Sequence, residues 1–111
     1  MTFDYPLDMT REQAMIRRAD KLAVMVKRDY QYTGTDSVPN LAEFMDIVLD
    51  TISPSLRGLE AQIPLKRKLS RAKAILTKKT EEGESDKANY NQAVAALLAF
   101  LEEYKSTMAQ I

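Results

Sequence analysis

The segment YNQAVAALLAFLEEYKSTM, residues 90–108, carries the longest regular apolar pattern in the chain. Its large apolar residues recur in alternating steps of four and three positions, which is typical of a helix that packs along a coiled-coil-like seam. We therefore predict a helix, capped by Ser85 or Asp86, whose alanines let a neighbouring helix approach closely. The predicted seam consists of Tyr90, Val94, Leu97, Leu101, Tyr104 and Met108, and the alanines are Ala93, Ala95, Ala96 and Ala99.

Three further segments show helical periodicity. A capping box of Thr10 and Gln13 predicts the start of the first helix, and the loop around Gly34 and Pro39 follows its end. The predicted inward faces are Met15, Ala19, Leu22, Val26 and Tyr30 in the first segment, Leu41, Phe44, Met45, Val48, Leu49 and Ile52 in the second, and Leu65, Leu69, Ala72 and Leu76 in the third.

The second helix is expected to start after Pro39, where Asn40 and Glu43 form another capping box. Pro54 lacks the amide hydrogen that the helix ladder needs, so we expect an interruption near Ser53. A new short helix is predicted to start there, followed by a second break at Pro64. Its predicted inward residues are Leu56, Leu59 and Ile63.

No segment shows strand alternation, and no long linker divides the 111 residues. The sequence therefore predicts an all-α, antiparallel four-helix bundle with a proline-interrupted second helix. We expect one helical-bundle domain over residues 1–111, with residues 1–9 as a loose N-terminal arm. The longest apolar run, residues 93–101, is shorter than the roughly 20 residues of a membrane span. With no secretion signal either, we expect a cytoplasmic protein.

The composition excludes several kinds of site. The chain contains neither cysteine nor histidine, which removes disulfides, the usual zinc sites and a serine–histidine triad. We therefore expect a protein that is not an enzyme and has no catalytic residues, cofactor or metal. Asp46 and Asp50 lie one helical turn apart and could hold a divalent cation, but a solvated face explains them better because no Glu-x-x-His element accompanies them.

Charge is unevenly distributed along a chain whose formal net charge is zero. Residues 64–79, PLKRKLSRAKAILTKK, carry seven positive charges and no negative one, whereas acidic residues prevail in residues 33–60 and 80–111. One interpretation is that these cations form solvated ion pairs with neighbouring helices, each worth about 0–1 kcal/mol. The other is a surface for an electronegative partner. The residues that we assign to such a partner-binding surface are Arg67, Lys68, Arg71, Lys78 and Lys79.

A second basic flank lies on the first helix and could extend this surface if the two helices were adjacent, which the sequence does not decide. It consists of Arg17, Arg18, Lys21 and Arg28.

Several partners fit a basic helix. A protein partner is the main hypothesis. The alternative is a nucleic-acid-associated accessory protein of phage or plasmid type that binds phosphates through the same bases, although zero net charge argues against it. Residues 51–63 are similar to the second helix of a helix-turn-helix, but only Arg57 and Gln62 could contact DNA there. A membrane surface and a homodimer formed through the last helix remain further alternatives.

The order of elements in the first half resembles that of bacteriocin immunity proteins. The first helix ends in VKRDYQY (residues 26–32), a glycine-containing loop follows, and SVPNLAEFMDIVL (residues 37–49) enters the second helix. That bacterial family consists of cytoplasmic four-helix bundles that protect a producer cell by acting on a receptor-associated complex at the membrane. The resemblance implies an immunity protein, or a comparable regulator or inhibitor, that works by protein binding. The second half departs from the family at Pro54, Pro64 and residues 93–99, and no functional residue is carried over.

Overall fold

A computed structural model describes residues 10–34, 36–77 and 86–110. It contains four helices, α1 (Arg11–Asp29), α2 (Ser37–Leu56), α3 (Gln62–Thr77) and α4 (Asp86–Ala109), and no strand within the described ranges. The prediction of an all-α chain is confirmed there. None of these helices is both long and apolar enough to cross a lipid bilayer. The predicted arm of residues 1–9 and the expected cap Ser85 lie outside the described residues.

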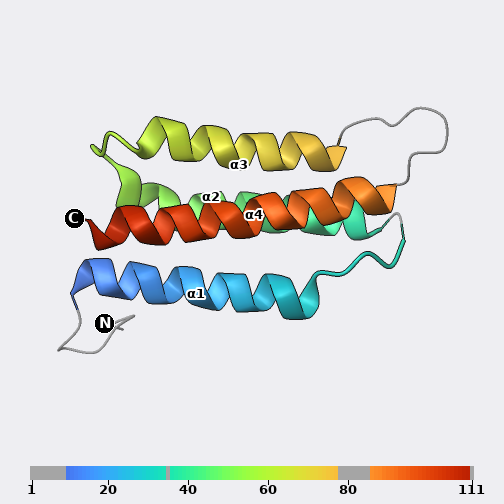
Figure 1. Cartoon of the computed structure of the whole chain (residues 1–111), viewed down its shortest axis with the longest axis horizontal. Coiled ribbons are helices and arrows are strands. Elements are labelled where there is room, and N and C mark those ends of the chain that lie inside the picture. The colour runs from blue at the N-terminus through green and yellow to red at the C-terminus, as the bar shows by residue number, and fades with distance from the viewer. Residues whose placement is uncertain (1–9, 35, 78–85, 111) are drawn as a thin grey trace.

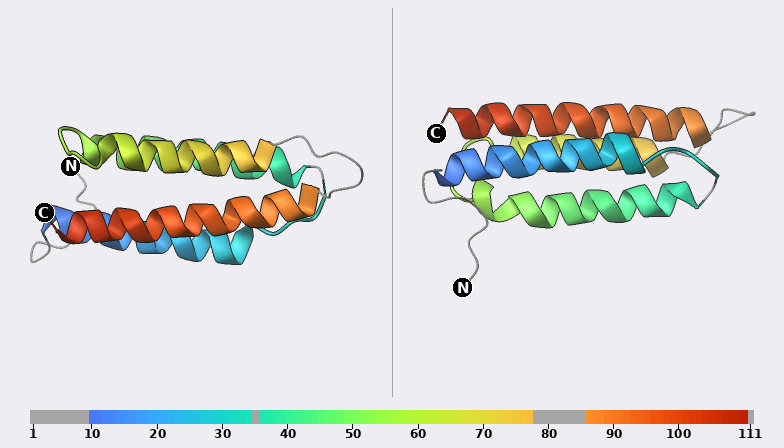
Figure 2. Two further views of the ribbon diagram at one scale, coloured as in Figure 1. Left: turned by 45° about the horizontal axis from the view of Figure 1, so that its top comes forward. Right: turned by 90° about the horizontal axis from the view of Figure 1, so that it is seen from below.

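The four helices lie side by side (Figure 1). Figure 2 shows two layers, one formed by α2 and α3 and the other by α1 and α4. The most extensive contacts join α4 to α3 and to α1, while α2 packs mainly on α3. Within the described helices, no Cα atom of α1 lies within 8 Å of a Cα atom of α3. Helix α4 therefore separates the first helix from the basic third helix.

The start of α1 has the predicted capping box. The Thr10 hydroxyl oxygen accepts a hydrogen bond from the backbone N–H of Gln13 (3.1 Å), and the Gln13 side chain accepts one from the backbone N–H of Thr10 (3.0 Å). Two amides that have no partner within the helix are satisfied in this way.

The predicted start of α2 is wrong. The helix begins at Ser37, so Pro39 is its third residue and Asn40 lies inside it rather than at its cap. Proline is tolerated here because first-turn amides have no carbonyl partner within the helix. The Ser37 hydroxyl, which is buried, accepts a hydrogen bond from the backbone N–H of Thr33 (2.8 Å) and thereby fixes the preceding loop against the helix.

The expected helix start at Ser53 is also wrong. Helix α2 continues through Pro54 and ends at Leu56, followed by a turn in which Gly58 has φ +77°. That left-handed conformation favours glycine and redirects the chain toward α3. Of the residues expected inward in the short helix, Leu56 is buried, but Ile63 is 63% exposed in the first turn of α3.

The core is formed by one face of each helix. All four residues of the stripe predicted in α3 are buried, as are five of the six seam residues of α4, with Val94 half-buried. In α1, Ala19 and Val26 are buried, and the rest of the predicted stripe is half-buried against them. The core also includes Phe100, which the seam pattern did not contain. Periodicity therefore identified most of the inward positions.

One polar contact ties α4 to the end of α2. The Ser55 hydroxyl donates a hydrogen bond to the carbonyl oxygen of Ile52 (2.6 Å), so the Tyr104 hydroxyl donates its proton to Ser55 (2.6 Å). Tyr104 is 1% exposed, and burial raises the pKa of its phenol above the ordinary value. This hydrogen bond satisfies a polar group that would be costly to bury alone.

Candidate functional site

Helix α3 carries five cationic side chains and no carboxylate. Two of them form ion pairs with neighbouring helices. The Lys68 ammonium contacts the Glu103 carboxylate of α4, and the Lys73 ammonium lies 2.7 Å from the Asp46 carboxylate of α2. All four side chains remain substantially exposed, so each pair is worth about 0–1 kcal/mol. The ion-pair interpretation of the basic segment is therefore confirmed for Lys68 and Lys73.

Three cations of α3, Lys66, Arg67 and Arg71, form no ion pair with a described residue. Arg67 and Arg71 are exposed and lie one helical turn apart. Lys78 and Lys79, which we also assigned to the binding surface, lie outside the described residues. The structure thus brings Arg67, Lys68 and Arg71 together, two of them without an anionic partner.

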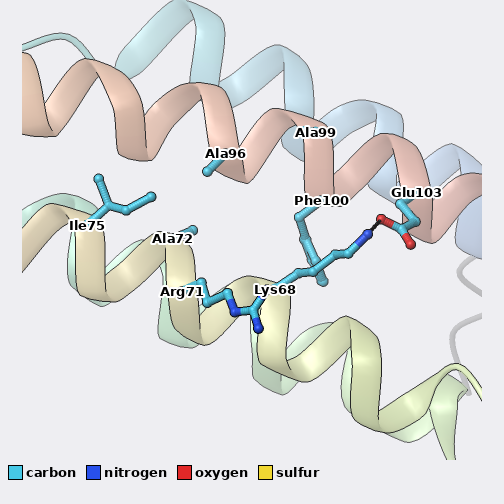
Figure 3. Close-up of a pocket in the computed structure, with 8 residues that line it drawn as sticks. All are labelled: Lys68, Arg71, Ala72, Ile75, Ala96, Ala99, Phe100 and Glu103. Atoms are coloured by element: carbon cyan, nitrogen blue, oxygen red, sulfur yellow. Dashed lines mark hydrogen bonds and ion pairs between the residues drawn. The ribbon is translucent and has the colours of Figure 1, made fainter.

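A groove runs between α3 and α4 beside these cations, with a volume of about 230 Å³. Figure 3 shows the Phe100 ring extending from α4 toward α3, and the Lys68 side chain reaching across to Glu103. Arg71 stays on the α3 side. The lining is mostly apolar, and comprises Lys68, Arg71, Ala72, Ile75, Ala96, Ala99, Phe100 and Glu103.

The dimensions and lining of the groove limit what it can bind. Its volume is below the roughly 300–1,000 Å³ of typical small-molecule pockets. The apolar part would bury a few side chains of a protein partner, while Arg71 at the edge offers a planar fork of donors to a carboxylate. Glu103 lies in the same lining and pairs with Lys68, so the anionic groups of a partner fit on the α3 side of the groove. The groove therefore suits an apolar segment with acidic neighbours.

The basic flank of α1 does not join this surface. Arg17, Lys21 and Arg28 lie on the opposite side of α4 from α3, as Figure 1 shows for the two helices. The Arg28 guanidinium donates to the Asp29 carboxylate (2.8 Å), which raises the pKa of Arg28 and lowers that of Asp29. Part of this flank is therefore neutralised within α1 itself.

Helix α1 also has a carboxylate that pairs with α4. The Lys105 ammonium donates to Asp20 of α1 (2.6 Å) and contacts Glu102 of its own helix (2.8 Å). These hydrogen bonds raise the pKa of Lys105. The pairing engages a carboxylate of α1 with a cation of α4, whereas α3 has no acidic residue of its own.

The other candidates from the sequence are not assembled into sites. Asp46 is engaged by Lys73, and the described residues contain no group of three or more His, Cys, Asp or Glu residues that could hold a metal ion. Arg57 follows the end of α2, and Gln62 is the first residue of α3. Because residues 57–61 form a turn, the helix that would enter a DNA groove does not exist.

The groove was not expected from the sequence. Ala96 and Ala99 were interpreted as helix-packing positions, yet Ala99 is exposed and both line the groove. A signal was present, since residues 88–101 contain no charged side chain although part of that helix faces outward. Outward helix faces normally carry charge.

Compared with protein-family models, with curated proteins and with solved structures, the chain matches none.

Proposed function

We propose that the protein is not an enzyme and acts by binding a protein partner in the α3–α4 groove. The observation that carries this proposal is an apolar groove edged by Arg71, with a second unpaired arginine, Arg67, one turn away. Burying apolar side chains supplies affinity, and the two guanidinium groups select a partner that presents carboxylates. Lys68, already paired with Glu103, helps to define one end of the groove.

A protein partner fits this surface better than phosphate-rich partners. The aromatic ring in the groove, Phe100, is only 2% exposed and so offers no stacking surface for a nucleic-acid base. An anionic membrane would leave a concave apolar lining unfilled, because its headgroups are polar. The nucleic-acid function is therefore kept as an outcome of the test.

We infer that the scaffold of this site is the antiparallel four-helix bundle that the sequence predicts. The contacts of α4 with α3 and α1, and of α2 with α3, support this arrangement. A cytoplasmic site of action fits a chain without cysteine. An immunity protein, or a comparable regulator or inhibitor, is the biological role that we propose for such a binder.

Site-specific photo-crosslinking in the cells that make the protein tests the proposal. The photoreactive residue replaces Gln92, which is exposed and precedes Ala96 and Ala99 on the same face of α4. The matched control places it at Asp50, which is exposed on α2. We expect one discrete protein adduct from position 92 and none of that size from position 50.

Two charge reversals show which cations matter in the same experiment. Arg71→Glu removes a groove cation, whereas Arg17→Glu makes the same change in net charge on α1. The adduct at position 92 should be lost with Arg71→Glu and kept with Arg17→Glu. Equal adducts at positions 92 and 50, no adduct at either, or an adduct that nuclease removes would each contradict the proposal.

A further inference from the structure

We infer that the occupant of the α3–α4 groove is an amphipathic helix. Two carboxylates, one helical turn apart, lie along one edge of its apolar face. This inference rests on the proposed function and names the partner element that the site would bind. Its occupant is thus a helix of another protein rather than an extended peptide.

The walls of the groove favour a helical occupant. Both walls are faces of helices, α3 and α4, whose backbone amides and carbonyls are engaged in their own helices. An extended peptide leaves half of its backbone groups to be satisfied by the surface on which it lies, and it normally finds them at a sheet edge. A helix satisfies its own backbone and packs its side-chain ridges between those of two others.

The apolar lining indicates which side chains the occupant presents. Ile75 from α3 and Ala96 and Ala99 from α4 line the groove together with Phe100. Small residues on α4 allow close approach, so larger aliphatic side chains of the occupant would fill the volume. Such side chains recur at three- and four-residue spacing on one face of an amphipathic helix.

The charges indicate where the carboxylates lie. Arg67 and Arg71 are four residues apart on one helix, which separates them by about 6 Å along its axis. Two acidic residues at the same spacing on an occupant aligned with α3 would each face one guanidinium. Because Glu103 lines the α4 side, carboxylates on the flank that faces α4 would be repelled. The occupant therefore needs its acidic residues on the flank that faces α3.

Displayed peptide libraries test this inference with the full-length protein. One library consists of helical peptides with two glutamates one turn apart on one flank, randomised at the apolar positions. A second library has the glutamates moved to the polar face opposite the apolar stripe, and a third carries a central proline that prevents helix formation. We expect peptides to be enriched from the first library only.

Variants of the protein show where the enriched peptides bind. Their affinity, measured by fluorescence anisotropy, should fall at least tenfold for Arg71→Glu and stay within twofold for Arg17→Glu. No enrichment from any library, equal enrichment from the proline library, or equal losses with both variants would overturn the inference. If the adduct at position 92 persists while the libraries fail, the helical occupant is wrong and the proposed function stands. If the adduct is also absent, the proposed function fails as well.

Discussion

Helix α4 presents two faces of opposite character. Toward the core it presents large side chains such as Leu97 and Tyr104, both almost fully buried. Toward the groove it presents Ala96 and Ala99, with the buried Phe100 ring shared by the core and the groove lining, and no charged residue lies between Lys87 and Glu102. The first face holds the four helices together, while the second leaves space beside a cationic helix. Stability and binding should therefore respond to different substitutions on one helix.

The largest effect is expected on the core face. Leu97 is fully buried, and Leu97→Ala removes apolar contacts and leaves a cavity. We expect the free energy of unfolding to fall by about 2–5 kcal/mol, as measured by urea denaturation followed by circular dichroism. A loss below about 0.5 kcal/mol, the range of ordinary surface substitutions, would show that α4 does not pack as described.

Filling the groove should weaken binding strongly and change stability little. Ala99 is exposed at the groove, so Ala99→Trp should lower the free energy of unfolding only by the helix-propensity difference, about 0.7 kcal/mol or less. Binding of the crosslinked partner should weaken at least tenfold, about 1.4 kcal/mol, because the indole occupies the space that the partner would fill. Unchanged affinity in a titration followed by anisotropy would place the binding surface elsewhere.

Tyr104→Phe tests the polar contact at the end of the core face. Without the hydroxyl, the hydrogen bond to Ser55 is lost, and we expect the free energy of unfolding at neutral pH to fall by about 1 kcal/mol. Urea unfolding at pH 7 measures this loss. Full retention of stability would mean that the buried hydroxyl contributes nothing.

The same variant should change how strongly the free energy of unfolding decreases at high pH. Burial raises the pKa of Tyr104 above its ordinary value of 10.0 in the folded protein, so the unfolded chain loses this proton first as pH rises. The contribution of Tyr104 to stability is therefore fully present below pH 10 and is lost as the pH rises above it. Tyr104→Phe should show a smaller fall between pH 9 and 11. Part of this decrease in stability should remain in the variant, because burial also raises the pKa of Tyr90 and of Tyr30.

The smallest effect is expected at the ion pair across the groove. Lys68 and Glu103 are both substantially exposed, so a double-mutant cycle with alanine at each position should give a coupling of about 0–1 kcal/mol. Raising the salt concentration should reduce it further. A coupling above about 2 kcal/mol, well beyond the range of exposed pairs, would make this pair part of the scaffold rather than the edge of a binding site.

The helix faces could be predicted because periodicity reports directly which residues are buried together. The stripe of α3, from Leu65 to Leu76, and the seam of α4 needed no tertiary information. Helix ends were harder to predict. Pro39 and Pro54 were expected at breaks, but a proline within the first turn loses no helical hydrogen bond, and Pro54 is tolerated two residues before the end of α2.

The uncharged residues 88–101 were the signal for the groove, but its position could not be predicted because it depends on which helices are neighbours. We expected a neighbouring helix to approach Ala96 and Ala99 closely, but periodicity does not show which helices are neighbours, and Ala99 is exposed. Likewise, the charges of α3 could be counted from the sequence, but only the packing shows that Lys68 and Lys73 find carboxylates while Arg67 and Arg71 do not. Pairing between helices is a property of the whole fold.

The most direct test of the groove as the binding site is an amide chemical-shift titration of the isotope-labelled protein with the crosslinked partner. We predict that the largest shifts occur at Arg71, Ile75, Ala96 and Ala99, with none at Val24, which is 57% exposed on the outer face of α1. Shifts centred on Val24 and its neighbours, with the α3–α4 residues unchanged, would contradict the assignment.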